Sequence, residues 1–457
     1  MNTDKIRVCV LAEAEIGGTG KAATIYAAEL ISRGYEVDYL AAEGPRSAFL
    51  KSRGVRSLDP GKSDTDLYDY MTRYRPQVIH QHVPGYPTDN RLYRALRRVH
   101  FGKRPKIIET NVFGRLEDPE GDDLIDFRMF VSMASAAQSF QRAGIKDPMA
   151  FLNRHTVLYN PVLPAKRMEL TERRQFRSQL GVTDDNVLVV RVGRPGHKWN
   201  SWECKAHASA RKDVPQLCLF LMEPPTWLTR KIEQGKFGRG IIVHRETSEF
   251  DWLDQVYASA DVMIHASDWG ESFGYTIAEG MVAGLPVITR STPWGDNAQV
   301  ELVNNDRTGF VCWSVPEMAR RLVELGQDSV LRVKMGSAGA KRIVELSDIK
   351  NETDILEEVI HHVLGDRPLS KIKTRNEELT EFCRKFPARE RATSVRSPLS
   401  FTDFASASIY RTYRCARSGA RAVIDRIKRH QVGWHPHQDG APRLGKRPRL
   451  IPFSTDA

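Results

Sequence analysis

The sequence predicts an α/β protein with two doubly wound, Rossmann-like domains and a basic, partly helical C-terminal extension. Short β-branched runs alternate with longer helical patterns through the first 365 residues, which is typical of parallel sheets covered by helices. The alternation pauses at a proline-containing linker, residues 160–164, and then restarts. With 457 residues, 41% of them hydrophobic, the chain can build two separate cores.

The first domain is predicted to span residues 1–160. A helix is expected at 22–33, because its apolar spacing is helical and Gly34 suits the residue after a helix end. The predicted strands lie at 7–11, 36–40, 77–80, 106–109, 129–133 and 156–159.

The second domain is predicted to span residues 161–348. Its expected strands lie at 187–192, 217–222, 240–244, 261–265 and 286–289. From residue 316 the apolar spacing becomes helical, with helices expected at 316–325, 329–345 and 349–364.

The composition excludes several classes of protein. The six cysteines are scattered without a C-x-x-C pair, so neither a zinc ribbon nor a disulfide framework is indicated. No apolar run approaches the roughly 18 residues of a membrane helix. The apolar run at 7–12 is followed closely by Glu13 and Glu15, so it is interpreted as a strand rather than a signal peptide. The sequence therefore predicts a cytoplasmic protein.

The net charge of +11 belongs to the C-terminal extension. Residues 366–457 contain 20 Lys and Arg but only 9 Asp and Glu, so the rest of the chain is neutral. Apolar and basic residues between 401 and 430 follow helical steps, which predicts a basic amphipathic helix able to lie on an anionic membrane. A helix that packs on the main body or binds a protein partner fits the same pattern. The end, 434–457, is predicted to be disordered.

A glycine-rich turn, residues 17–21, follows the first predicted strand. Such a turn lets backbone N–H groups approach an anion at a helix N-terminus. It is not a P-loop, because Glu15 stands where that motif needs Gly and Ala22 where it needs Ser or Thr. An ordinary tight turn is the alternative interpretation.

Two cations follow the first strand of the second domain. Arg194 and Lys198 lie at the carboxyl end of strand 187–192, the edge at which open α/β sheets bind ligands. A guanidinium and an ammonium there suit a diphosphate. A solvated basic loop would have the same composition.

The segment 271–280 carries the strongest signal. Glu271 ends a loop, and Phe273 and Gly274 open a helix whose free N–H groups favour a phosphate. Glu279, just over one turn into that helix, can accept hydrogen bonds from both vicinal hydroxyls of a ribose. Two glutamates on an ordinary surface helix are the alternative.

Taken together, these segments resemble glycosyltransferase family 4, the retaining group 1 enzymes of the GT-B fold. The resemblance covers roughly residues 5–365 and is strongest in the second half. Its most specific part is 271–286, which carries the two glutamates of the family with seven residues between them. The other matching segments are 17–18, 159–161, 193–198, 257–262, 301–303 and 308–309.

The resemblance implies a GT-B architecture in which the two domains face a cleft and a helix within 349–365 crosses back to the first domain. It implies that Glu271, Arg194 and Lys198 are catalytic. It also implies that the donor is bound by Glu279, Phe273, Gly274, Ser272, Gly18 and Gly17. No metal and no cofactor are expected, because cations and a helix N-terminus replace Mg²⁺.

The first domain departs from the family pattern. Asn111 stands where many members carry a His after the strand at 106–109, and Asn cannot act as an acid or base. Asn111 and His82 are candidate contacts for the acceptor or the sugar. For His82 and the neighbouring His80, a structural role is the alternative.

The predicted function is the metal-independent transfer of a sugar, with retention, from a nucleotide-sugar to a hydroxyl of a glycan or lipid-linked acceptor. The enzyme would be of the hexosyltransferase type and could lie at the membrane surface. Another GT-B activity, that of a nucleotide-sugar epimerase or a phosphorylase, is the alternative. Nucleic-acid binding by the basic tail is a rival from a different class, but the neutral body argues against it, so no nucleic-acid partner is expected.

Overall fold

The computed structural model describes residues 5–12, 17–61, 63–84, 90–100, 104–114, 121–145, 153–165, 168–194, 196, 198–244, 250–293, 295–365 and 369–395. The basic helix predicted at 401–430 and the disordered end predicted at 434–457 lie outside these ranges. None of the helices within them combines the length and the apolar character that crossing a bilayer requires.

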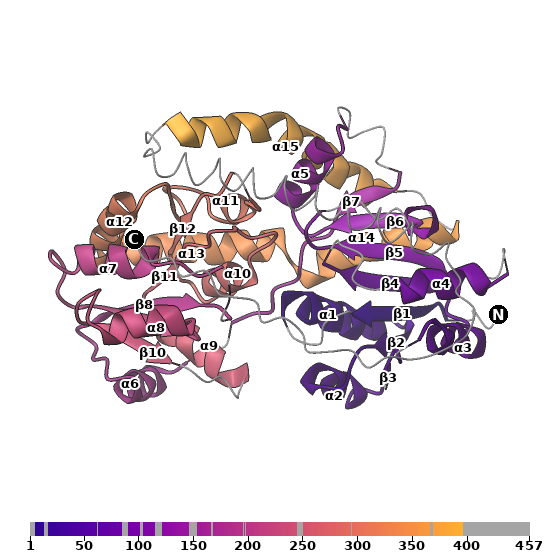
Figure 1. Ribbon diagram of the computed structural model, residues 1–457, viewed down its shortest axis with the longest axis horizontal. Helices are drawn as coiled ribbons and strands as arrows, with labels where there is room; N and C mark the ends of the chain where they lie inside the picture. Colours follow the sequence, from indigo (N-terminus) through magenta and orange to yellow (C-terminus); the bar gives the residue numbers. More distant parts are fainter. Residues whose placement is uncertain are drawn as a thin grey trace, which may run out of the picture. The chain divides into compact units, whose positions relative to one another are not determined.

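The first domain is built on a seven-stranded parallel sheet with the order β3-β2-β1-β4-β5-β6-β7 (Figure 1). The chain starts in the middle of the sheet, winds to one edge and returns to the other side of β1, so the order reverses between β1 and β4. The strands are β1 Arg7–Ala12, β2 Glu36–Leu40, β3 Arg56–Leu58, β4 Val78–Val83, β5 Lys106–Asn111, β6 Phe127–Phe130 and β7 His155–Val157.

The second domain repeats this plan with a six-stranded parallel sheet of order β10-β9-β8-β11-β12-β13. Its order reverses between β8 and β11, the two strands that precede the predicted charged segments. The strands are β8 Val187–Val192, β9 Leu217–Met222, β10 Ile241–His244, β11 Val262–His265, β12 Val287–Arg290 and β13 Gly309–Cys312. The predicted α/β fold class with two doubly wound sheets is confirmed.

Helices cover both faces of each sheet (Figure 1). Those of the first domain are α1 Gly18–Ser32, α2 Pro45–Lys51, α3 Asp64–Tyr74, α4 Arg91–Arg98, the 3-10 helix η1 Asp122–Leu124 and α5 Met133–Arg142. Those that follow are α6 Leu170–Gln179, α7 Trp202–Ala210, α8 Thr226–Glu233, α9 Phe250–Ser259, α10 Tyr275–Val282, α11 Gln299–Leu302, α12 Val315–Gln327, α13 Ser329–Leu346, α14 Ile349–Leu364 and α15 Ser370–Val395.

Strand alternation explains how one sheet serves two cores. Val8 and Val10 of β1 pack with residues of α1 and α14. Cys9, which lies between them, points to the opposite face and packs with residues of α3 and α4. The helix α14 therefore packs in the core of the first domain, and α15 lies against α14, α5 and β7.

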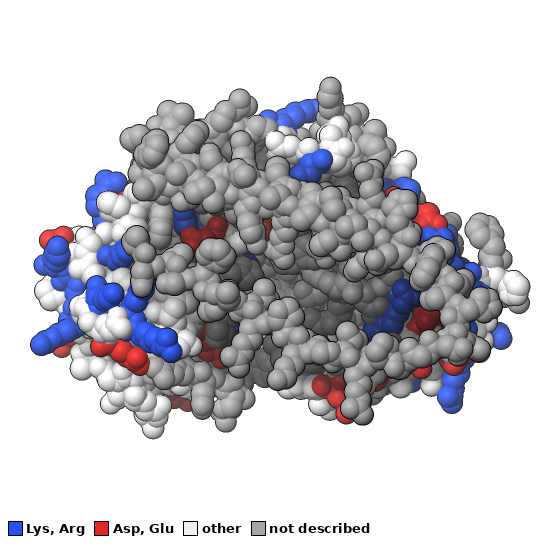
Figure 2. Space-filling model, viewed as in Figure 1, with Lys and Arg blue, Asp and Glu red and all other residues white. Residues whose placement is uncertain are grey.

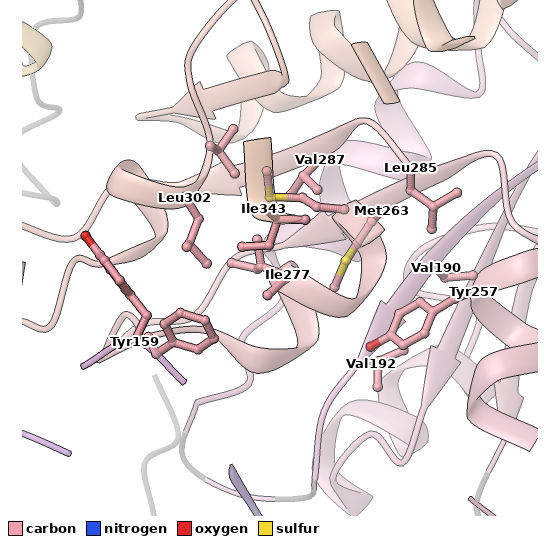
Figure 3. Packing of buried hydrophobic residues seen from close by; sticks show 14 of the residues in the cluster. Tyr159, Val190, Val192, Tyr257, Met263, Ile277, Leu285, Val287, Leu302 and Ile343 are labelled. Atoms are coloured by element: carbon pink, nitrogen blue, oxygen red, sulfur yellow. The ribbon is translucent and has the colours of Figure 1, made fainter. Parts of the chain in front are cut away.

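The core of the second domain surrounds α10. Figure 3 shows Ile277 of this helix among the side chains of Met263, Val287, Leu302 and Ile343, all of them fully or almost fully buried. This packing holds α10 firmly against its sheet, so the loop before it and its first turn have a fixed position. On the face seen in Figure 2, Lys and Arg lie intermixed with Asp and Glu over the described surface.

Several predicted boundaries are wrong. Met133, predicted in a strand, begins α5 instead, because the Ser132 side chain caps the helix by accepting the N–H of Ser135. Gly18 is the first residue of α1 rather than part of a turn before it. The short strands β3 and β13 were not predicted.

Two candidate site residues of the first domain lie inside strands rather than beyond them. The strand β4 continues to Val83 and includes His82, and β5 ends with Asn111. Both side chains are buried. The sequence pattern placed these strand ends too early because polar residues were taken as the end of each strand.

Candidate active site

The glycine turn of the first domain meets the second domain at close range. Gly17 precedes α1 with φ 103°, a conformation that favours glycine. A Cβ atom on Gly17 would lie 2.8 Å from Nη2 of Arg194, and one on Gly18 would lie 2.8 Å from the Tyr275 ring. The absence of side chains at both positions therefore allows the two domains to approach each other here.

Glu279 of α10 is the centre of a contact between the domains. Its Oε1 lies 2.6 Å from Nζ of Lys21, which belongs to the first turn of α1. The hydroxyl of Tyr257 donates to its Oε2 at 3.1 Å. Both oxygens of this predicted ribose-binding carboxylate are thus engaged. Neither Lys21 nor Tyr257 was predicted as a site residue.

Glu271 lies between two nitrogen donors. The Lys198 ammonium is 2.7 Å from Oε2, and Nε2 of His265 is 2.9 Å from Oε1. Burial opposes ionisation of this carboxyl, but Lys198 and His265 outweigh it, so the pKa of Glu271 lies well below its usual value. Glu271 is therefore a carboxylate at neutral pH, held in place from both sides.

His265 was not among the predicted site residues. It is the last residue of β11 and is almost fully buried. Burial and the nearby Arg191 lower its pKa to about 4, even though its hydrogen bond to Glu271 acts in the opposite direction. The imidazole is therefore neutral near pH 7 and donates Nε2–H to Glu271. A polar residue that ends an otherwise apolar strand was the signal in the sequence.

The first turn of α10 has the features that the sequence predicted for anion binding. Gly274 precedes the helix in the left-handed region, with φ 99°, and no side chain caps the helix N–H groups. The backbone oxygen of Ser272 accepts a hydrogen bond of 2.6 Å from Ser132 of the first domain, and Phe273 is buried beneath it. No side chain therefore competes with an anion for these N–H groups at the positive end of the helix dipole.

The loop that carries Arg194 and Lys198 is held by Trp199. Its indole N–H donates to the Arg194 carbonyl at 2.8 Å, and the Arg191 guanidinium lies 4.5 Å from the centre of its ring. Arg191 in turn forms a buried ion pair with Glu203 at 2.9 Å. The Arg194 side chain is exposed and reaches Gly17 of the first domain.

The two candidates of the first domain belong to a buried polar layer. Asn111 donates to Glu109 at 3.1 Å, and Glu109 also pairs with Arg128 at 2.8 Å. The ring of His82 lies 4.2 Å from that of His80, and neither ring nitrogen of His82 has a hydrogen-bond partner. Burial lowers the pKa of His82 to about 3, so it is neutral. The structure does not bring either residue to the surface.

A buried carboxylate joins the two domains beside this site. Glu301 accepts hydrogen bonds from the N–H groups of Met133 and Ala134, at 3.2 and 2.9 Å, and from the hydroxyl of Tyr159 at 2.5 Å. It thereby caps α5 of the other domain. Tyr159, just before the linker, also donates its N–H to Glu352 at 2.7 Å, and its carbonyl oxygen accepts from the Tyr26 hydroxyl at 2.5 Å.

Comparison with known proteins agrees with this architecture. Residues 187–328 match the family model described as glycosyl transferases group 1. HepE from Anabaena, solved with UDP and glucose, is 17% identical, with 78% of this chain and 99% of that chain covered and a TM-score of 0.63. A glycosyltransferase from Rickettsia africae is 15% identical, with 80% and 100% covered and a TM-score of 0.64.

A more distant structure is a variant of TarM from S. aureus, solved with fondaparinux, alpha-GlcNAc-glycerol and UDP. It is 8% identical, with 78% of this chain and 99% of that chain covered and a TM-score of 0.57. A search of curated protein sequences found no match. At these identities the solved structures establish the fold, which is GT-B. The family match of residues 187–328 gives the enzyme class, so the chain is a glycosyltransferase.

Proposed function

We propose that the chain is a retaining, metal-independent glycosyltransferase of family 4, which moves a sugar from a nucleotide-sugar to a hydroxyl of a glycan or lipid-linked acceptor. The observation that carries the proposal is the arrangement of Lys198, Glu271 and Glu279 around the first turn of α10. These residues lie within the part of the chain that matches the family model. The two carboxylates can accept hydrogen bonds from the hydroxyls of a sugar and a ribose. The ammonium and the N–H groups of α10 can bind the oxygens of a diphosphate.

Each group has a distinct role in the proposed reaction. Glu279 accepts hydrogen bonds from the donor ribose, and Glu271 accepts them from the transferred sugar. Arg194 and Lys198 neutralise the diphosphate as it departs, and the N–H groups of α10 bind its oxygens. The glycines at 17 and 18 admit the phosphates close to the first domain.

Retention is explained by attack on the face from which the leaving group departs. The acceptor oxygen forms the new bond to the anomeric carbon while the bond to the diphosphate breaks. The acceptor proton passes to the departing phosphate oxygen, so no protein base is needed. This agrees with the environment of Glu271, whose lowered pKa makes it a poor proton acceptor at neutral pH.

The proposal that no metal is needed rests on the cations of the site. Arg194 and Lys198 supply positive charge beside an uncapped helix N-terminus, which is what a divalent ion supplies in other transferases. Among the described residues, no three His, Cys, Asp or Glu side chains gather as a metal site.

A glycan acceptor is proposed partly because a structural relative, TarM, was solved with glycan ligands. A position at the membrane surface is proposed for the segment 401–430, from its sequence alone. Vesicle co-sedimentation should compare the full chain with one ending at Pro398, since α15 packs on the first domain and must be kept. If both chains bind anionic vesicles equally at low salt, the segment has no such role.

The proposed function is tested by a thermal-shift screen of nucleotide-sugars. A true donor raises the unfolding temperature as its concentration rises, because it binds only the folded chain. Incubation of the identified donor with glycan acceptors then gives a product whose anomeric configuration is read by NMR. Inversion would contradict the assignment to a retaining family. The absence of any stabilising nucleotide-sugar would contradict the donor site itself.

A further inference from the structure

Lys21 is a charged residue of the site for which the proposed roles leave no task. It follows the glycine turn and lies in the first turn of α1. A cation in the first turn of a helix is unfavourable, because the helix dipole is positive there. Helix stability therefore does not explain the residue. Its ammonium reaches across to the second domain and forms the ion pair of 2.6 Å with Glu279.

This ion pair occupies Oε1 of Glu279, one of the two oxygen atoms that the ribose of a donor would need. Oε1 of Glu279 is taken by Lys21, and Oε2 accepts from Tyr257. A ribose that presents two vicinal hydroxyls to this carboxylate must compete with the ammonium. The side chain of Lys21 is 32% exposed, and a partly exposed ion pair contributes little to stability, so its displacement is easy.

The surroundings of Lys21 favour an anion as its second partner. The N–H groups that begin α1 lie beside it, with no side-chain cap. Arg194 of the second domain approaches Gly17, and Arg46 of α2 lies 3.4 Å from the Gly17 carbonyl oxygen. A lysine on a flexible four-carbon stem can move from a carboxylate to a phosphate within such a cluster.

We infer that Lys21 is a donor-sensing residue that holds Glu279 in the empty enzyme and passes to the donor diphosphate when the ribose takes Glu279. The inference rests on the proposed function, because it uses the ribose contact of Glu279. It adds a diphosphate ligand from the first domain, and it makes the contact between the domains depend on whether the donor is bound.

The inference predicts opposite effects of one substitution on two ligands. In Lys21→Met, a nucleoside without phosphates no longer competes with the ammonium, so its affinity is unchanged or higher. The corresponding nucleoside diphosphate loses a charged contact, so its affinity falls about tenfold or more. Calorimetric titration of the protein with three pairs of ligands measures both affinities. The pairs are UDP and uridine, GDP and guanosine, and ADP and adenosine. Lys21→Arg, which keeps the charge, should restore much of the diphosphate affinity.

Matched controls separate this role from a structural one. Lys51→Met removes an exposed lysine of α2 that pairs with Glu43 in the preceding loop, and it should change neither affinity. Equal losses for the nucleoside and the diphosphate in Lys21→Met, or no loss for the diphosphate, would overturn the inference while leaving the proposed function standing. Failure of the unsubstituted chain to bind any of the three diphosphates would instead overturn the proposed function.

Discussion

The carboxyl edges of the two sheets differ in the chemistry that they present. At the edge of the second sheet, charged groups are matched at short range: Glu271 with Lys198, Glu279 with Lys21, and Arg191 with Glu203. At the edge of the first sheet, His82 is buried, neutral and without a hydrogen-bond partner. The charged groups of the second edge gather beside α10. At the first edge the buried charges of Glu109 and Arg128 pair with each other, and Gly17 and Gly18 allow a close approach to the second domain.

This difference shows how the two halves of the enzyme divide their work. In the proposed reaction, charges that are already in place would stabilise the leaving diphosphate without reorganisation, and such stabilisation is usually the largest contribution to catalysis. At the first edge Glu109 and Arg128 are buried and neutralise each other, so this edge imposes fewer electrostatic requirements on what it binds. Substitutions at the second edge should therefore change catalysis most, and those at the first edge should change stability or affinity.

The largest effect is expected for Arg194→Ala. In the proposed mechanism Arg194 neutralises the departing diphosphate, so loss of the guanidinium should lower kcat by about a hundredfold. Steady-state kinetics with the identified donor measure this. The control is Arg174→Ala, which removes an exposed arginine paired with Asp184 and should leave kcat unchanged. A similar small change in both variants would show that the second edge does not act through charge.

Substitution of one glutamate should change donor affinity, and substitution of the other should change kcat. Glu279→Ala should weaken the donor by about 1.5–3 kcal/mol, because it loses a charged hydrogen-bond acceptor. Glu271→Ala should instead lower kcat by a comparable free energy, because its proposed contact is with the transferred sugar. Donor titration and steady-state kinetics distinguish the two. Glu324→Ala, at a surface pair with Arg321, is the control, and unchanged kinetics in both site variants would refute the assignment.

A smaller effect, on the free energy of unfolding, is expected from substitution of His82, the buried histidine of the first edge. In the unfolded chain, His82 binds a proton near pH 6.5, but its pKa in the folded protein is about 3. Between these values the unfolded state binds more protons, so the free energy of unfolding falls as the pH is lowered. Between pH 7 and pH 5, the free energy of unfolding should fall by about 2 kcal/mol less in His82→Leu than in the unsubstituted chain.

Urea unfolding at the two pH values measures this difference. The exposed His100 provides the control variant, His100→Leu, which should unfold like the unsubstituted chain. If His82→Leu keeps the full pH dependence but loses activity, the ring contacts the acceptor rather than the core.

The smallest effect is expected from removing divalent metal. In the proposed mechanism Arg194 and Lys198 supply the positive charge, so transferase activity should be the same in excess EDTA as with Mg²⁺. Complete loss of activity that Mg²⁺ or Mn²⁺ restores would contradict the proposed mechanism.

The sequence predicted most of the second edge and little of the first, for a physical reason. Arg194, Lys198 and Glu271 could be placed in the fold because each lies in a loop after a strand, and Glu279 because it lies in the next helix. Their roles were taken from the family resemblance and stay a proposal. Lys21 could not be assigned a contact, because its partner Glu279 is far away in the chain and is brought near only by tertiary structure.

The errors of the prediction have similar causes. His82 was placed beyond the end of β4 because a polar residue in a fully buried strand looks like the end of that strand. The three residues of β3 are too few to show a period. Met133 was assigned to a strand because an apolar run passes from β6 directly into α5, and only the cap at Ser132 marks the change.

The contact of Glu301 with α5 determines how this enzyme can be recombined with its relatives. A chimera that exchanges the second domain at the linker also exchanges the acceptor of the Met133 and Ala134 N–H groups and of the Tyr159 hydroxyl. If the incoming domain has no carboxylate at this place, these buried donors are left unsatisfied at a cost of about 1–3 kcal/mol each. Modular exchange of the second domain therefore requires that an acidic residue at this position be transferred or restored with the domain.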